Sequence, residues 1–216
     1  GDTHSKPITP GQRADTRISQ YPDAGLEPIA FPDSPLISIL MPVFNTPIPW
    51  LEAAINSVQE QTYSNWELRI VNDASDEDSV QRTLHSYSTP RIRVRHLNER
   101  KNIAGATNEA LRMARGIYVL FLDHDDLLST SALMSIALAI NETKADIIYS
   151  DEDFIDINGD RTQPNFKPDY SPDLLLAHNY ITHLLAVRRQ LCIDAGGLRT
   201  GYDGAQDYDL LLRLTD

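Results

Sequence analysis

The densest group of residues able to do chemistry is the run Asp123-His124-Asp125-Asp126, which directly follows the apolar segment 117–122. Ligands of open α/β sheets bind outside the carboxyl ends of strands, so these acidic side chains are expected to face a substrate crevice. Three carboxylates within four residues repel one another, and hard oxygen donors select Mg²⁺ or Mn²⁺. The run therefore predicts a divalent cation that bridges the protein and a phosphorylated ligand. The alternative is that these acids only favour the start of the next helix.

Two further polar segments follow predicted strands. Asp73, within 72–76, could accept a hydrogen bond from a bound base or sugar, although Asp and Ser at a strand end are also common turn residues. The segment 100–108 joins a basic pair to a helix start that contains Gly and small residues. Its backbone N–H groups, together with Lys101, could hold a diphosphate, and a plain surface loop is the competing interpretation.

The segment 204–209 brings Asp207 to the start of a predicted helix, where a carboxylate would suit a general base. Its alternative role is an N-cap, and Asp209 is expected to pair with Arg213 one turn later. The acidic run 151–153 follows another strand, so it could line an acceptor site or be solvated. For His178 and His183, a satisfied and partly buried histidine is the simpler interpretation.

Alternating strands and helices must position these groups. Short apolar runs predict strands, and apolar residues at helical spacing predict the helices between them. A hairpin is expected around Asn158-Gly159. Gly116 is expected to end the helix at 102–115, and Ser129 or Thr130 is expected to cap the start of the helix at 129–141. This alternation indicates a layered α/β domain. The strands are expected at 37–41 (ending at Pro42), 66–71, 91–96, 117–122, 146–150 and 184–187, and the helices at 51–58, 79–87, 102–115, 129–141, 174–177, 190–195 and from 206.

Composition limits the remaining possibilities. The 216 residues carry 19 Lys and Arg against 31 Asp and Glu, and a net charge of −12 argues against general binding of nucleic acid or anionic lipid. The single Cys192 is expected to be a buried apolar filler, and no apolar run approaches the ~18 residues of a membrane span. Dinucleotide dehydrogenases, phosphate-loop NTPases and α/β-hydrolases are disfavoured because their glycine motifs are missing.

The chain is expected to hold one domain with a lead-in. Residues 1–35 contain six of the 13 prolines and predict an extended linker. Residues 36–216 then form the domain. Leucines still stand in helical register where the sequence stops, so we expect a longer protein with further domains.

Five segments in order resemble the motifs of inverting family-two glycosyltransferases with the GT-A fold. They are Pro42-Val43-Phe44-Asn45, Asn72-Asp73-Ala74-Ser75, 102–108, Leu122 to Asp126, and Gln206 to Asp209. The resemblance extends over roughly Pro35 to Asp216 and implies a three-layer α/β/α sandwich around a mostly parallel sheet. Three more segments resemble the subgroup that assembles bacterial O-antigen, rhamnan and related surface polysaccharides: Tyr149 to Asp153, Phe166 to Asp169, and Asn179-Tyr180.

The resemblance implies a role for each matching residue. Asp123 and Asp125 would be the Asp-x-Asp pair that binds Mn²⁺ or Mg²⁺, with Asp125 the direct ligand and Asp123 also near the nucleotide. Asp207 would be the base that takes a proton from the acceptor. Acceptor-side candidates are Glu152, Asp153 and His183. On the nucleotide side, Pro42, Phe44 and Asn45 would border the nucleotide, Asp73 would bind uracil or thymine, and Lys101 and Asn108 would lie near the diphosphate or ribose.

The donor implied is a UDP- or dTDP-sugar, and the acceptor a growing surface glycan or its lipid-linked precursor. The location implied is the cytoplasm, including the cytoplasmic face of the inner membrane. Asn72 and Gln206 stand where the family usually has Asp and Glu. A further metal-site His of such enzymes is expected beyond residue 216.

Two other functions compete with this interpretation. A hydrophobic strand that ends in Asp-x-Asp is also the first motif of haloacid-dehalogenase-like phosphotransferases, with Asp123 as nucleophile and Asp125 as acid. That superfamily usually places the nucleophile on the first strand, whereas here three predicted strands precede it. The second alternative is a non-catalytic carbohydrate- or partner-binding module with the same fold.

Overall fold

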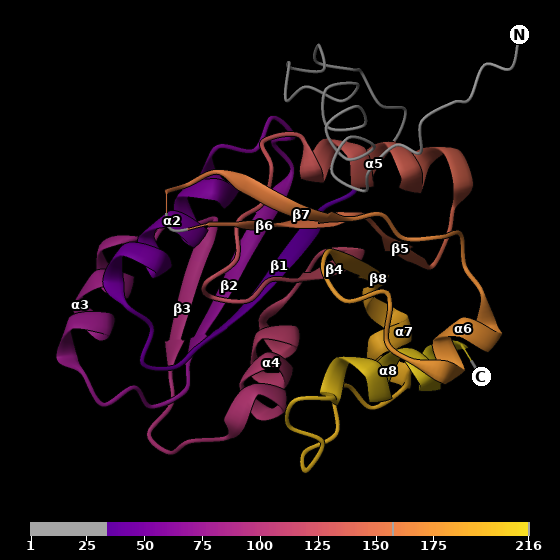
Figure 1. Cartoon of the computed structure of the whole chain (residues 1–216). Helices are drawn as coiled ribbons and strands as arrows, with labels where there is room; N and C mark the ends of the chain where they lie inside the picture. The colour runs from indigo at the N-terminus through magenta and orange to yellow at the C-terminus, as the bar shows by residue number, and fades with distance from the viewer. Residues whose placement is uncertain (1–33, 157, 216) are drawn as a thin grey trace, which may run out of the picture.

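The computed structural model describes residues 34–156 and 158–215. Its centre is a six-stranded sheet with the order β3-β2-β1-β4-β8-β5 (Figure 1). Neighbours among β1 to β4 are parallel, whereas β8 is antiparallel to both β4 and β5. The mostly parallel sheet predicted from sequence is therefore confirmed. Its strands are β1 (Ile37–Val43), β2 (Trp66–Asn72), β3 (Ile92–His96), β4 (Tyr118–Phe121), β5 (Ile147–Tyr149) and β8 (Leu185–Arg188).

Helices cover both faces of the sheet, which is why every residue of β1 and β2 is buried. On one face, α2 (Ile48–Gln59), α3 (Asp78–Ser86) and α5 (Ala132–Thr143) share a hydrophobic core with Ile39 and Met41. On the other face, Leu40 and Val71 share a second core with α4 (Asn102–Met113), α6 (Pro172–Ala177), α7 (Arg189–Asp194) and α8 (Gln206–Thr215). Two cores separated by one sheet make the expected three layers.

The parallel strands bring their carboxyl ends to one edge of the sheet. There the N–H of Asp73 donates to the carbonyl of Val43 at 2.8 Å, and the N–H of Leu122 donates to that of Leu40 at 3.1 Å. A hairpin of β6 (Glu152–Ile155) and β7 (Arg161–Asn165) runs from the β5 side toward α2 (Figure 1). The hairpin predicted around Asn158-Gly159 is confirmed, and Gly159 takes the positive φ of +86° that its turn requires.

Strand β1 does not stop at Pro42, as the sequence suggested, but continues to Val43. The backbone groups of successive strand residues point to opposite sides. The Leu40 carbonyl accepts from Leu122, after β4, and the Val43 carbonyl accepts from Asp73, after β2, so the nitrogen of Pro42 points to the β4 side. Pairing with β4 has already ended at Leu40, so the missing N–H of proline removes no ladder hydrogen bond there.

Gly116 does not close α4, which ends at Met113 with Ala114 as its C-cap. Instead, Gly116 allows the chain to pass close to the start of β1. An added Cβ would lie 2.6 Å from the Leu36 carbonyl oxygen and 2.7 Å from Ser38 Oγ. The glycine is therefore required by packing and not by helix termination.

The N-cap predicted for α5 is also wrong. The helix begins at Ala132, with Ser131 as an N-cap whose side chain makes no capping bond. The cap comes from elsewhere, because Gln61 Oε1 accepts from the N–H of Leu133 at 3.0 Å while Gln61 Nε2 donates to the Ser129 carbonyl at 2.7 Å. A side chain distant in sequence thus satisfies the helix N-terminus.

The sequence analysis also made predictions about Cys192, the linker 1–35 and membrane-spanning segments. Cys192 is fully buried in the second core, as predicted, and burial raises the pKa of its thiol to about 12. The predicted linker 1–35 lies outside the described residues except for its last two. In the described part of the chain, no helix has both the length and the apolar character that a membrane crossing would need.

Candidate active site

The acidic run forms the turn after β4 at the carboxyl edge of the sheet. The N–H of Asp126 donates to the Asp123 carbonyl at 3.3 Å, and this turn brings Asp123 and Asp126 toward His183. His183 Nε2 lies 3.6 Å from Asp123 Oδ2, and His183 Nδ1 lies 3.7 Å from Asp126 Oδ2. One ligand atom from each residue lies within 4.8 Å of the other two. We call Asp123, Asp126 and His183 the acid–histidine group.

Crowding changes the electrostatics of this group. Each of its side chains is 40–46% exposed, so a ligand can reach it. Burial is nevertheless the main cause that raises the pKa of Asp123 and of Asp126; His183 opposes the rise in both, and Asp125 adds to it. The two carboxylates carry negative charges that are costly without a cation, and together with the imidazole nitrogen they form a donor set that suits Mg²⁺ or Mn²⁺.

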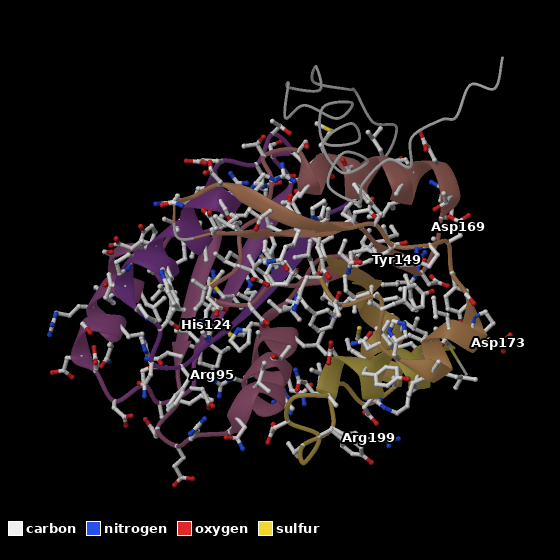
Figure 2. All side chains as sticks on the ribbon, viewed as in Figure 1. Arg95, His124, Tyr149, Asp169, Asp173 and Arg199 are labelled. Atoms are coloured by element: carbon white, nitrogen blue, oxygen red, sulfur yellow. The ribbon has the colours of Figure 1, made fainter. Side chains whose placement is uncertain are left out.

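Asp125 lies outside the acid–histidine group, although the sequence suggested it as the direct metal ligand. Its Oδ1 lies 3.6 Å from Nδ1 of the neighbouring His124, and its side chain is 49% exposed. Arg95, on β3, and His124, after β4, lie toward the same end of the sheet (Figure 2). The structure thus brings Asp126, and not Asp125, next to His183, while the charge of Asp125 helps to raise the pKa of Asp123.

Asp207 lies in the first turn of α8, near enough to Asp123 for its charge to raise the pKa of Asp123. Its Oδ2 accepts a hydrogen bond from Asn179 Nδ2 at 2.9 Å, so the carboxylate is held by a neighbouring segment. Asp209 pairs with Arg213 at 2.8 Å, which confirms the predicted ion pair. Of the two acids, Asp209 is thus held in an ion pair, and Asp207 is the one whose charge acts on Asp123.

The loops after β1 and β2 are tied together on the nucleotide side of the predicted site. Asn45 takes a positive φ of +48°, donates from Nδ2 to Asp76 Oδ2 at 2.8 Å, and accepts the Asp76 N–H at 2.9 Å. Asp73 is 3% exposed, and its Oδ1 accepts the N–H of Lys101 at 2.6 Å, which joins the end of β2 to the start of α4. Asp73 thus has a structural partner as well as a proposed ligand.

Pro42 and Phe44 frame the first of these loops. Pro42 is buried within β1, and the Phe44 ring carries the Arg100 guanidinium 3.8 Å from its centroid. This distance is that of a cation–π contact. Arg100 therefore joins Phe44 at the border where the sequence predicted a nucleotide.

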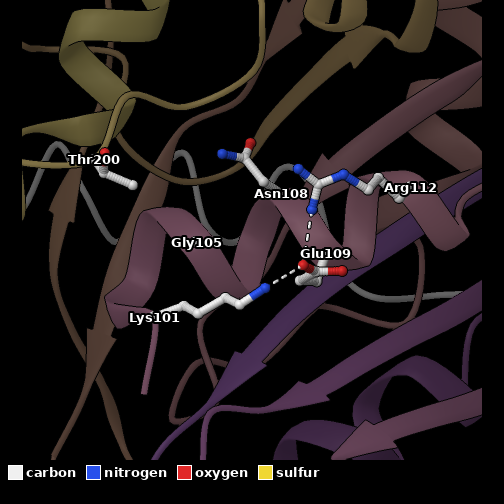
Figure 3. Close-up of a pocket in the computed structure, with 6 residues that line it drawn as sticks. All are labelled: Lys101, Gly105, Asn108, Glu109, Arg112 and Thr200. Atoms are coloured by element: carbon white, nitrogen blue, oxygen red, sulfur yellow. Dashed lines mark hydrogen bonds and ion pairs between the residues drawn. The ribbon is translucent and has the colours of Figure 1, made fainter. Parts of the chain in front are cut away.

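Lys101 lines a cavity of about 290 Å³ whose other lining residues are Thr200 and four residues of α4. Figure 3 shows Lys101, which directly precedes α4, and Arg112, in the last turn of α4, reaching to the carboxylate of Glu109. Their nitrogens lie 2.6 and 2.9 Å from Glu109 Oε1, and Arg95 Nη1 lies 2.8 Å from Oε2. The hydrogen bond from Lys101 is the main cause that holds the pKa of Glu109 below its ordinary value. The Lys101 ammonium is thus already paired.

Asn108 joins α4 to the chain after α7. Its Nδ2 donates to the Leu198 carbonyl at 2.8 Å, and its Oδ1 accepts the Leu198 N–H at 2.9 Å. Gly197, with a φ of +72°, precedes this contact, and a Cβ there would clash with Asn108 Oδ1. Both ends of the amide have backbone partners, which gives Asn108 a structural role in joining the two segments.

The acceptor-side candidates Glu152 and Asp153 also have internal partners. Glu152 accepts from Thr182 Oγ1 at 2.8 Å, from Asn165 at 2.9 Å and from the N–H of His183 at 3.1 Å. Burial alone would raise the pKa of Glu152, but these hydrogen bonds and the nearby Lys167 charge bring it below its ordinary value. Asp153 pairs with Arg161 across the hairpin at 2.6 Å.

Sequence reasoning gave no individual role to Asp126, Lys167 or Asn179. Asp126 belongs to the acidic run, and the other two lie in segments noted only for their resemblance to a subgroup. His183 was placed on the acceptor side, whereas it contacts the acids after β4. Apart from those segments, nothing in the residue spacing could have identified these contacts.

Comparisons with known proteins add to this geometry. A family model described as "Glycosyl transferase family 2" matches residues 38–197. The uncharacterized protein y4gI of Sinorhizobium fredii is 43% identical over 184 residues, which cover 84% of this chain and 20% of that protein. The O-antigen biosynthesis protein RfbC of Myxococcus xanthus is 42% identical over 212 residues, or 97% of this chain and 16% of RfbC. The chain thus spans a fifth or less of the length of these relatives.

Solved structures share the fold. S. aureus TarS 1-349 in complex with UDP-GlcNAc superposes with a TM-score of 0.67 at 20% identity, covering 82% of this chain and 52% of that one. The mannosyltransferase PcManGT of Pyrobaculum calidifontis, in complex with GDP-Man and Mn²⁺, superposes with a TM-score of 0.60 at 20% identity. This second match covers 94% of this chain and 57% of that one.

Proposed function

Because the chain belongs to glycosyl transferase family 2 over residues 38–197, we propose that it transfers a sugar from a nucleoside-diphosphate donor to a hydroxyl of a bacterial surface polysaccharide or of its lipid-linked precursor. The family and the GT-A fold expected from the sequence motifs are confirmed by the family match and the structural neighbours. The single observation that carries the proposal is the acid–histidine group with Asp207 beside it, at the carboxyl edge of the sheet. The name of the relative RfbC supports the acceptor class.

Asp123, Asp126 and His183 would hold a Mn²⁺ or Mg²⁺ ion in this proposal. Two carboxylates and one imidazole within 4.8 Å form a suitable donor set, and the Mn²⁺ in the PcManGT complex supports a metal. When bound, the cation offsets the negative charge that grows on the departing diphosphate. Asp126 replaces Asp125 as the second acidic ligand, and Asp125 keeps the local potential negative.

Asp207 is the proposed general base. It takes the proton of the acceptor hydroxyl while that oxygen forms a bond to C1 of the donor sugar and the bond from C1 to the diphosphate breaks. The hydrogen bond from Asn179 orients the Asp207 carboxylate and occupies only one of its two oxygens, Oδ2. Attack from the face opposite the diphosphate inverts the configuration at C1.

The nucleotide is proposed to lie against the loops after β1 and β2. Phe44 with its bound Arg100 gives a flat, positively charged border, and Asn45 keeps the loop in place. Asp73 is proposed to bind the uracil or thymine ring of a UDP- or dTDP-sugar. The complex of TarS with UDP-GlcNAc supports a uridine nucleotide. We also propose that the protein acts in the cytoplasm, at the inner face of the membrane, where its acceptor would be assembled.

Thermal unfolding with nucleotides tests the proposal. We expect UDP or dTDP to raise the melting temperature only when Mn²⁺ is present, because a ligand that binds only the native state stabilises it. GDP is the matched control nucleotide, and Asp123→Asn is the control variant that should abolish the metal-dependent part. If neither UDP nor dTDP stabilises the chain with any divalent cation, the proposed function is refuted.

A further inference from the structure

Residues 181–183 carry His183 to the acid–histidine group, and two charged side chains outside that group hold this segment. Lys167 Nζ donates hydrogen bonds to the carbonyls of Ile181 and His183. Glu152 accepts from Thr182 Oγ1 with both carboxylate oxygens, at 2.8 and 3.0 Å, and from the His183 N–H at 3.1 Å. Polar groups of all three residues in the segment are therefore bound by one Lys–Glu pair.

Lys167 of this pair is buried, and the Glu152 side chain is 22% exposed. The Lys167 side chain is 2% exposed, and its Nζ lies 3.4 Å from Glu152 Oε2. Taking two charges out of water costs free energy, and such a pair is weak evidence for stability alone. Its hydrogen bonds give it another role, because they are directed at the backbone on both sides of His183.

The hairpin anchors the same pair. Asn165, at the end of β7, donates to Glu152 at 2.9 Å, and the N–H of Lys167 donates to Asp151 Oδ1 at 2.7 Å. Glu152 begins β6, so both charged residues are fixed at the base of the hairpin. From there they reach the segment that places the His183 ring between Asp123 and Asp126.

We propose that Lys167 and Glu152 are positioning residues that hold His183 against Asp123 and Asp126 and thereby set the affinity of the acid–histidine group for a divalent cation. The inference rests on the proposed function, because it takes that group as the cation site. Groups that orient a metal ligand from behind commonly change metal affinity by 10- to 100-fold when they are replaced. A pair that only stabilises the fold would lower the melting temperature and leave the affinity unchanged.

Mn²⁺ binding to the 216-residue chain, measured by electron paramagnetic resonance of free Mn²⁺ with UDP present, tests this inference. We expect His183→Ala to give the largest loss of affinity, and Lys167→Met and Glu152→Gln to weaken Mn²⁺ binding about 10-fold. Thr182→Val replaces the hydroxyl that Glu152 binds by a methyl group and leaves Lys167 and Glu152 paired. Because one contact of the segment with Glu152 is lost, it should weaken Mn²⁺ binding severalfold. Arg161→Gln is the control, because it breaks an ion pair of the same hairpin, with Asp153, and should keep the wild-type affinity.

The outcomes separate the two proposals. Wild-type protein that binds neither Mn²⁺ nor UDP refutes the proposed function and this inference with it. If the wild type binds and His183→Ala weakens binding, while folded Lys167→Met, Glu152→Gln and Thr182→Val keep full affinity, the positioning role alone is refuted. Equal weakening by Arg161→Gln also refutes it. If Lys167→Met or Glu152→Gln fails to fold, the result with Thr182→Val decides.

Discussion

Replacing Glu109 by Gln tests the electrostatics of the cavity on α4. The Glu109 side chain is 6% exposed and lies within 2.6–2.9 Å of nitrogens from Lys101, Arg112 and Arg95. Those three cations are 47–65% exposed, so water screens each pair to about 0.2–1 kcal/mol. Glutamine keeps the size and one acceptor oxygen, and we expect the free energy of unfolding to fall by about 0.6–3 kcal/mol, the sum over three such pairs.

The pH dependence gives this prediction its sign. The pKa of Glu109 is lower in the folded chain than its ordinary value of 4.5, so the carboxylate stabilises the fold fully above the unfolded pKa and loses this effect as pH falls through the folded pKa. Urea unfolding should therefore separate Glu109→Gln from wild type at about pH 7, and the two should converge at a pH below the lowered pKa of folded Glu109. Glu142→Gln, on exposed α5 surface, is the charge-matched control. A loss that is equal at both pH values would refute the electrostatic reasoning.

Three other changes follow from the structure. Asp207→Asn should keep Mn²⁺-dependent UDP binding in calorimetry. It should slow the formation of UDP from a UDP-sugar in the transfer reaction by roughly 10²- to 10⁴-fold, and an unchanged rate would exclude Asp207 as the base. Asp126→Asn should weaken Mn²⁺ binding more than Asp125→Asn does, and the opposite order would identify Asp125 as the ligand. Gly116→Ala should lower the free energy of unfolding by about 1–3 kcal/mol in urea titrations, because its Cβ would lie 2.6 Å from the Leu36 carbonyl oxygen. Full stability of that variant would show that the start of β1 can move.

The strands, the helices and the hairpin could be predicted because their signals are local. The apolar run of β1 and the helical spacing of α2 are visible within a few residues, and Asn158-Gly159 specifies its own turn. Helix ends were predicted less well. The cap of α5 comes from Gln61, and the end of α4 precedes Gly116 by three residues, because both places are governed by contacts with distant segments.

The candidate site divides in the same way. Asp123, Asp73 and Asp207 could be selected because they follow strands or begin a helix, where the carboxyl edge of a parallel sheet meets its ligands. The choice between Asp125 and Asp126 could not be made, since a turn points adjacent side chains in different directions. The internal partners of Asn108 and Glu152 were equally hidden, because Leu198 and Thr182 lie far from them along the chain.

The family, the layered sheet and the edge at which the acidic residues gather could be inferred from the chain alone, because periodicity and ordered motifs are properties of short segments. The approach of His183 to Asp123 and Asp126, and the contacts of Lys167 and Glu152 with its backbone, are visible only in the folded chain. Hydrogen bonds and ion pairs act over a few ångströms of space, whereas the residues that make them here are separated by long stretches of chain.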